Sequence, residues 1–250
     1  MIKTKRLEKL NNLALKYYVK HLHQSKRAQE YLYSRISKKI AARYFIGYAP
    51  NGGFIKYLNA HGVKEADAKD TGLVILDYDG NAFERFANRI MVPIVHAGRL
   101  VGFGGRTLGE ETEKNPKYIN SKTSLLYNKS EVLYGLWRAR SSMDKLGYGF
   151  LVEGYFDVLG LATHKVHNCV GLCGTALTRE QAKQLKRYTD KIYVMLDGDE
   201  AGKLAAKKAK IVLKKEKVYA GRMILPKKLD PDDFVKKYGR KALNKVKLIK

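Results

Sequence analysis

Hydrophobic and polar positions alternate along this chain in two different ways. In the first part, leucines recur near the helical period and predict helices over residues 6–45, with a separate short helix at Ser37–Arg43. The leucines that carry this pattern are Leu7, Leu10, Leu13 and Leu15. Over residues 46–128, glycine and asparagine turns separate short apolar runs, and two of these runs bracket His96–Arg99, which predicts a hairpin.

From Gly149 onward, apolar runs of strand length alternate with helical patterns. The predicted strands are Gly149–Val152, Asn168–Leu172, Lys191–Leu196 and Val218–Leu225. The predicted helices are Tyr155–His164, Thr178–Tyr188, which begins with a capping box, and Ala201–Lys215. Such alternation predicts a parallel sheet flanked by helices. We therefore expect an α/β protein, with an α+β basic subdomain at 1–128 followed by a parallel-sheet domain at 129–250.

The charge of the chain narrows the class of partner. The sequence has 250 residues, with 49 Lys and Arg against 24 Asp and Glu, a formal net charge of +25. A field of this size favours a polyanion, although a soluble basic protein is the simpler alternative. An anionic membrane is not favoured, because no apolar run approaches the ~20 residues of a span and no basic helix has a clean apolar face. With no signal peptide at its start, the chain is expected in the cytoplasm.

The two cysteines, Cys169 and Cys173, lie in one apolar stretch. A structural zinc site needs four ligands, and no second Cys or His pair is nearby, so we expect two buried thiols.

Acidic residues gather where the predicted strands end. Glu153 follows the first strand of the second part, Asp197 and Asp199 follow the third, and Asp230 and Asp232 follow the fourth. The carboxyl ends of parallel strands are where ligands bind in such sheets. Carboxylates suit Mg²⁺, and a metal pair stabilises both oxygens in phosphoryl transfer. The alternative is that each acid is a helix cap or turn residue.

Three acidic motifs, in this order, resemble the Toprim domain shared by topoisomerases, DnaG-type primases and some nucleases. They are Val152–Val158, Leu196–Gly202 and Leu229–Asp232. Further segments resemble the polymerase core of bacterial DnaG-type primases and extend the similarity through nearly the whole chain. These segments are Ile40–Pro50, Arg89–Pro93, Val101–Gly109, Pro116–Ser121 and Leu133–Leu136.

The resemblance implies a DNA primase, which makes short RNA primers on single-stranded DNA from ribonucleoside triphosphates. It implies that Mg²⁺ or Mn²⁺ is held by Glu153, Asp197, Asp199, Asp230 and Asp232, the first three being catalytic. It also implies that a second set of residues binds template or nucleotide: Arg106, Lys117, Tyr118, Asn120, Lys129 and Asp157.

DnaG-type primases usually carry a zinc ribbon and a helicase-binding domain as well, and this chain is expected to lack both. It is therefore expected to be either a fragment or a reduced primase, as in compact viral systems, with a replicative helicase or a separate zinc-binding protein as further partners. Its place would be the replication fork, in the nucleoid or in a host cytoplasm. Two alternatives stay open: a Toprim-type metal-dependent nuclease, and a non-catalytic nucleic-acid-binding module.

Two motifs imitate a functional site. Asp77–Gly80 resembles the later acidic pair, but Asp-Gly is a common turn, and no helix start follows it. Gly102–Gly105 lacks the helix that a nucleotide-binding glycine loop requires, so we expect a bulge or a close backbone approach.

Overall fold

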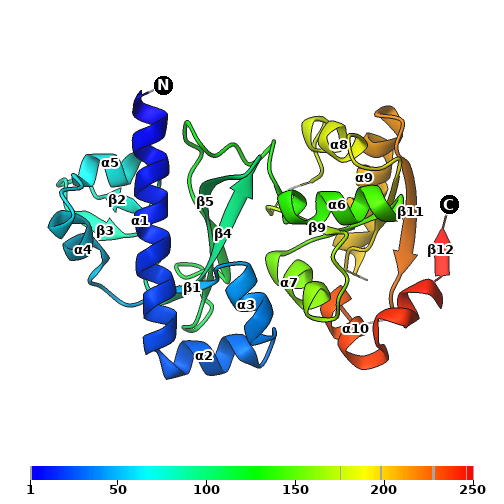
Figure 1. The fold of residues 1–250 in the computed structure, drawn as a ribbon, viewed down its shortest axis with the longest axis horizontal. Helices are drawn as coiled ribbons and strands as arrows, with labels where there is room; N and C mark the ends of the chain where they lie inside the picture. The colour runs from blue at the N-terminus through cyan, green and yellow to red at the C-terminus, as the bar shows by residue number, and fades with distance from the viewer. Residues whose placement is uncertain (1, 175, 198, 227–228, 246, 250) are drawn as a thin grey trace. The chain divides into compact units, whose positions relative to one another are not determined.

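The computed structural model describes residues 2–174, 176–197, 199–226, 229–245 and 247–249. The chain divides into two compact units, Met1–Asn128 and Lys129–Lys250, which occupy the blue-to-green and green-to-red parts of the ribbon in Figure 1. Each unit has its own sheet, so each can be understood from its own residues. None of the helices in the described ranges is long and apolar enough to cross a membrane.

The N-terminal unit is an antiparallel sheet, in the order β1-β4-β5-β6, with a long helix against it. The Tyr18 ring of helix α1 packs 5.2 Å from the Phe54 ring and 5.4 Å from the Phe103 ring, between ring centroids. An added Cβ at Gly47 would lie 2.6 Å from the Tyr18 Cβ, so a glycine there lets β1 approach α1. The helices are α1 Ile2–Gln24, α2 Lys26–Tyr33, α3 Lys38–Arg43, α4 Phe54–Ala60 and α5 Glu65–Asp70. The strands are β1 Gly47–Ala49, β2 Val74–Leu76, β3 Ala82–Glu84, β4 Arg89–His96, β5 Arg99–Thr107 and β6 Tyr118–Asn120.

The predicted hairpin is present, with a tighter turn than expected. Only Ala97 and Gly98 separate β4 from β5, and their φ angles of 47° and 81° match the turn that best fits twisted strands. A register shift near Ile94 makes a β-bulge, and an added Cβ at Gly105 would lie 2.6 Å from Phe86. The prediction of a bulge or close approach at Gly102–Gly105 is therefore confirmed.

The β2–β3 connection confirms the prediction that Asp77–Gly80 is a turn. The Oδ1 atom of Asp77 accepts hydrogen bonds from the backbone N–H of Asp79 at 3.0 Å and of Asn81 at 2.8 Å. Gly80 has a φ of 85°. Asp77–Gly80 is a turn whose acid satisfies its own backbone.

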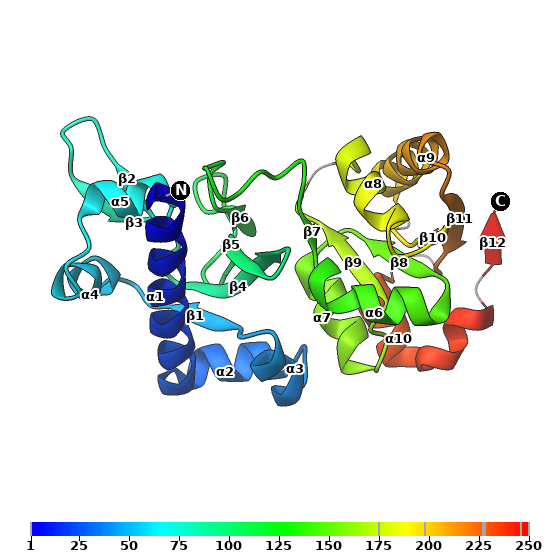
Figure 2. The same ribbon diagram turned by 45° about the horizontal axis from the view of Figure 1, so that its top comes forward.

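The C-terminal unit has a central sheet in the order β12-β11-β10-β8-β9-β7. The four inner strands pair in parallel, as predicted, and the short edge strands β7 and β12 pair antiparallel, which the sequence analysis missed. Helices α8 and α9 cover one face and α7 and α10 the other (Figures 1 and 2). The strands are β7 Leu133–Tyr134, β8 Gly149–Val152, β9 Cys169–Leu172, β10 Lys191–Val194, β11 Tyr219–Ile224 and β12 Lys247–Ile249. The helices are α6 Leu136–Leu146, α7 Tyr155–Thr163, α8 Arg179–Lys186, α9 Glu200–Lys215, α10 Pro231–Tyr238 and the 3₁₀ helix Arg240–Lys245.

The core of this unit lies between the sheet and helices α6, α8 and α9. Buried aliphatic side chains of the inner strands pack there against alanine and leucine side chains of the three helices. Cys169 and Cys173 are both buried and both free thiols, which confirms the prediction that they are apolar side chains of the interior.

Candidate active site

The acids predicted from the sequence follow neighbouring strands of one parallel sheet. Strand β8 ends at Val152, directly before Glu153. Its parallel neighbour β10 pairs Val194 with Leu151 and leads into Asp197. On the other side of β10, strand β11 runs parallel and leads toward Asp230. Because parallel strands end at the same edge, the topology brings these acids to one edge, which we call the acidic edge.

Glu153 and Asp197 are in direct contact at the acidic edge. The Oε1 atom of Glu153 accepts a hydrogen bond from the backbone N–H of Asp197 at 3.2 Å. Burial raises the pKa of Glu153, and the charges of Asp197 and Asp199 raise it further, while the hydrogen bond from Asp197 opposes them. Glu153 is therefore close enough to Asp197 and Asp199 for their charges to repel it, and a bound cation would relieve that repulsion.

The start of helix α9 holds the segment that carries Asp197 and Asp199. Asp199 is the N-cap residue, and its Oδ1 atom accepts a hydrogen bond from the Gly202 N–H at 2.7 Å. An added Cβ at Gly202 would lie 2.9 Å from the carbonyl carbon of Asp197 and closer still to its oxygen. Gly202 thus lets the first turn of α9 lie against the backbone of Asp197. Gly198, which lies between the two acids in the sequence, is outside the described residues.

Asp230 and Asp232 occupy two different positions at the start of α10. Asp230 is the N-cap residue, and its Oδ1 atom accepts a hydrogen bond from the Asp233 N–H at 2.7 Å. The half-buried Asp232 lies against Gly160 of α7, where an added Cβ would be 2.8 Å from its Oδ2 atom and closer still to its Oδ1. The structure therefore uses Asp232 in the contact between α7 and α10.

Asp157 lies half-buried in the first turn of α7. Its Oδ2 atom accepts a hydrogen bond from the Gly154 N–H at 2.8 Å. Burial raises the pKa of Asp157 to about 8; the Gly154 bond opposes this shift, and the charges of Asp230, Asp197 and Asp232 add to it. The Asp157 carboxyl therefore interacts electrostatically with the acids of the neighbouring strand ends.

The donor set fits a metal that is only partly held by protein. Among the described side chains, no group of three or more His, Cys, Asp or Glu could hold a metal ion as it stands. Two of the acids, Asp199 and Asp230, each use one carboxylate oxygen as a helix cap, as the alternative interpretation expected. Mg²⁺ needs only one or two carboxylates when water and substrate phosphates supply the remaining ligands. The residues therefore fit Mg²⁺ or Mn²⁺ bound together with a phosphate, and do not form an all-protein cage.

In the N-terminal unit, the expected template residues lie on two paired strands. Arg106 of β5 is opposite Tyr118 of β6, and Asn120 is opposite Gly104. The Arg106 guanidinium donates hydrogen bonds to the hydroxyls of Tyr118 and Tyr31. Its carbon also lies 5.1 Å from the centre of the Tyr118 ring. With the exposed Lys117 beside Tyr118, these residues form a compact basic and aromatic surface.

Two arginines to which the sequence analysis gave no role support this surface by binding its backbone carbonyls. Arg89, 4% exposed, donates to the carbonyl of Pro116 at 2.8 Å, to the Asn115 side chain at 2.6 Å and to the Gly105 carbonyl at 3.3 Å. Arg85 donates to the Asn120 carbonyl at 3.0 and 3.2 Å. Arg89 binds residues just before strand β6, and Arg85 binds the last residue of that strand, so together the two arginines position β6. For Arg89, the sequence signal that could have revealed this role is a charged residue at the start of an otherwise apolar run.

Lys129, in the C-terminal unit, is positioned by a buried glutamine. The Gln181 side-chain amide donates to the Lys129 carbonyl at 3.2 Å and to the Val132 carbonyl at 2.8 Å, and its oxygen accepts from the Thr178 N–H at 3.0 Å. The sequence identified Gln181 only as part of a capping box. The structure adds that it fixes the segment that leads from Lys129 into β7.

Comparisons with protein families match both units. Residues 17–140 match the family described as DNA primase catalytic core, N-terminal domain, and residues 150–235 match the family described as Toprim-like. The first match extends past Asn128 into α6. A DNA primase of Aquifex aeolicus is 38% identical over 233 residues, which are 92% of this chain and 46% of that protein. The chain thus spans less than half the length of this curated relative.

Solved structures resemble the whole fold. The zinc-binding and RNA polymerase domains of the Aquifex aeolicus primase give a TM-score of 0.91 at 35% identity, covering 99% of this chain and 62% of that one. A DNA primase domain from Pseudomonas aeruginosa gives 0.87 at 34% identity, covering 96% and 77%. A DnaG primase catalytic domain bound to single-stranded DNA gives 0.88 at 32% identity, covering 98% and 82%.

Proposed function

Because this chain belongs to the family of DnaG-type DNA primases, we propose that it is the RNA polymerase core of a primase. It would synthesise short RNA primers on single-stranded DNA from ribonucleoside triphosphates. The observation that carries the proposal is the contact of Glu153 with Asp197 across the ends of two neighbouring parallel strands. This arrangement favours transfer chemistry over a module that only binds nucleic acid, because the repulsion of Glu153 by Asp197 and Asp199 would otherwise be a cost.

In the proposed reaction, the 3′-hydroxyl of one nucleotide attacks the α-phosphate of the next, and pyrophosphate leaves. Mg²⁺ or Mn²⁺, held by the acids of the acidic edge with the substrate phosphates, would supply activation of the hydroxyl and neutralisation of the leaving group. Glu153 keeps the segment that begins at Asp197 in place through the Asp197 N–H. Asp199 and Asp230 are fixed by the helices that they cap. Such fixed positions matter because transfer is governed mainly by alignment and charge.

The basic surface of the N-terminal unit is the proposed template site. Arg106 and Lys117 would contact phosphates, Tyr118 would stack on a base, and Asn120 would contribute a hydrogen bond. In the C-terminal unit, Lys129 would approach the triphosphate of the incoming nucleotide and Asp157 would lie behind the metal-binding acids. Binding through lysine and arginine predicts an affinity that falls steeply with salt.

The partners of the proposed enzyme follow from the same family. A related catalytic domain has been solved with single-stranded DNA, which supports a single-stranded template here. A replicative helicase, or a separate protein with a zinc-binding domain, would complete the system at the replication fork. These assignments are drawn from longer relatives, since this chain covers 46% of the Aquifex aeolicus protein.

The test is primer synthesis by the wild-type chain beside Asp199→Asn. Asparagine caps helices about as well as aspartate, so this variant keeps the cap while it removes the negative charge. With single-stranded DNA, labelled ribonucleotides and Mg²⁺ or Mn²⁺, short products from the wild type alone are expected, with equal DNA binding by both proteins. Synthesis by both would refute the role of Asp199. Cleavage of the template without nucleotides would favour a nuclease instead.

A further inference from the structure

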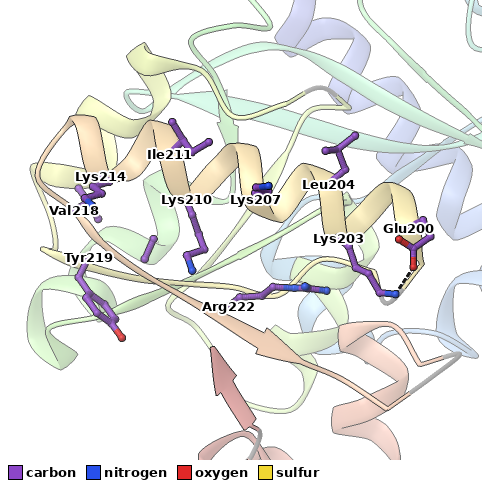
Figure 3. Close-up of a pocket in the computed structure, with 11 residues that line it drawn as sticks. Glu200, Lys203, Leu204, Lys207, Lys210, Ile211, Lys214, Val218, Tyr219 and Arg222 are labelled. Atoms are coloured by element: carbon purple, nitrogen blue, oxygen red, sulfur yellow. Dashed lines mark hydrogen bonds and ion pairs between the residues drawn. The ribbon is translucent and has the colours of Figure 1, made fainter. Parts of the chain in front are cut away.

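Helix α9 and strand β11 form the sides of a groove on the C-terminal unit, with a volume of about 830 Å³. Figure 3 shows the groove between the helix, from Glu200 to Lys214, and the strand segment from Val218 to Arg222. We call this the α9–β11 groove. It contains none of the residues of the acidic edge, so an inference drawn from it is independent of the proposed function.

A row of positive charge lines the groove. Lys203, Lys207, Lys210 and Lys214 recur at intervals of four, three and four residues, which places them on one side of α9 over a length of ~16 Å. Arg222 of β11 reaches into the same groove (Figure 3). The one acid that lines it, Glu200, forms an ion pair with Lys203.

The rest of this positive charge has no acidic partner within the described part of the chain. No ion pair is formed there by Arg222 or by three of the four lysines, which are Lys207, Lys210 and Lys214. Like charges held this close repel one another. An anionic ligand along the groove would therefore gain more than it would at scattered surface lysines.

Exposed apolar side chains lie beside the charged row. Leu204 is 54% exposed and Ile211 is 51% exposed, and they stand seven residues apart on α9, next to the lysines. Tyr219 of β11, 43% exposed, lies at the opposite side of the groove. Large apolar side chains grouped in a concave surface are typical of a site that another molecule covers.

These two properties together select one kind of occupant. A second copy of this chain is disfavoured because each carries a formal charge of +25. A single nucleic-acid strand would pair with the lysines, but bases stack on aromatic rings, and Tyr219 is the one aromatic residue among the described residues of the lining. A nucleic-acid strand bound to the lysines would therefore leave Leu204 and Ile211 in water. A protein segment that carries both carboxylates and apolar side chains satisfies both properties.

We propose that the α9–β11 groove is a docking surface for an acidic, amphipathic segment of a partner protein. Its carboxylates pair with the lysine row and Arg222, and its apolar side chains cover Leu204 and Ile211. A peptide of about three helical turns would match the length of the row.

The experiment measures fluorescence anisotropy with a labelled acidic peptide that carries leucines at helical spacing. The groove variant is Lys207→Glu with Lys210→Glu. The matched control is Lys208→Glu with Lys215→Glu, which makes the same charge change on exposed positions of the same helix outside the groove. We expect the groove variant to bind at least about tenfold more weakly, and the control to change by less than about threefold. All four positions are on the surface, and thermal melting verifies that both variants fold.

Two further arms test the apolar part and the kind of ligand. Leu204→Ser with Ile211→Ser is expected to weaken the amphipathic peptide, while an acidic peptide without leucines should bind weakly to the wild type. Equal binding of the two peptides, equal loss in groove variant and control, or no binding would each overturn the proposal. If the groove variant instead lost affinity for a labelled single-stranded oligonucleotide and the peptide did not bind, the groove would be a nucleic-acid surface.

Discussion

Replacing Gly202 with alanine should damage catalysis far more than stability. At this position the helix backbone has no positive φ angle, so alanine meets no backbone strain. Its methyl group would, however, lie 2.9 Å from the carbonyl carbon of Asp197, against an ordinary contact distance of 3.4–4 Å. Allowing for the oxygen, which lies closer still, the Asp197 backbone must move by about 1 Å.

The two energetic consequences of this change oppose one another. Overpacking costs typically about 1–3 kcal/mol, and the higher helix propensity of alanine returns up to about 1 kcal/mol. The expected net loss is therefore roughly 0–2 kcal/mol in the free energy of unfolding. A displacement of about 1 Å in a reacting group can lower a rate by about a hundredfold. Asp197 donates to Glu153 from the same backbone, so both acids would be disturbed.

The assay compares urea unfolding with primer synthesis for wild type and Gly202→Ala. We expect a small shift in the unfolding midpoint and at least about a tenfold loss of synthesis, with DNA binding unchanged. Gly109→Ala is a suitable control, because the nearest atom to its added Cβ is a side-chain nitrogen at 3.3 Å. Full activity of Gly202→Ala would refute the argument that this glycine positions Asp197.

Three other predictions test separate parts of the structure. The pKa of Asp157 is raised from 3.8 to about 8 in the folded state. The folded protein therefore binds one more proton than the unfolded protein between these pH values, and its stability should fall as pH rises through them. Calorimetry in EDTA should show a weaker fall for Asp157→Asn, and an unchanged pH dependence would contradict the assignment. Arg89→Met leaves the carbonyl acceptors of Gly105 and Pro116 without their buried donor. It should lower the free energy of unfolding by roughly 2–4 kcal/mol in urea titrations and also weaken DNA binding. DNA binding at wild-type strength would show that Arg89 does not position the template surface. Gly160→Ala should destabilise the protein, because its Cβ would strike Asp232, and combining it with Asp232→Ala should recover part of the loss; additive losses would show that the two residues do not touch.

The elements that the sequence predicted well are those whose pattern is local. Strands β8 and β9 are continuous apolar runs, which is how strands buried on both faces read. Strands β10 and β11 each include one basic residue, Lys191 and Arg222, and were predicted from the apolar residues beside it. The short strands β1, β6, β7 and β12 were missed because they have only two or three residues each, too few to show a period. In α1 the helix was predicted, but only part of its buried face. Leu13 and Leu15 are partly exposed, while Tyr17 and Tyr18 are buried.

For the candidate site, the sequence predicted which residue types gather and where the chain places them. A strand followed by an acid is a local signal, and topology then made the strand ends neighbours. It could not predict that Asp232 packs on Gly160, since that contact joins two helices far apart in the chain. The supporting roles of Arg85, Arg89 and Gln181 were missed for the same reason: each binds backbone carbonyls, which leave no mark in the sequence. Their partners become visible only once the chain is folded.

The arrangement around Arg106 also bears on the cost of binding. An arginine side chain that becomes immobile when a ligand arrives loses up to about 2 kcal/mol of rotamer freedom. Here the guanidinium is already held by the Tyr31 and Tyr118 hydroxyls, with their rings 5.6 and 5.1 Å away. That entropy is lost during folding and does not have to be lost again at the template. Removing both hydroxyls by changing the tyrosines to phenylalanine would return the loss to the binding step, as a less favourable binding entropy with the charge unchanged.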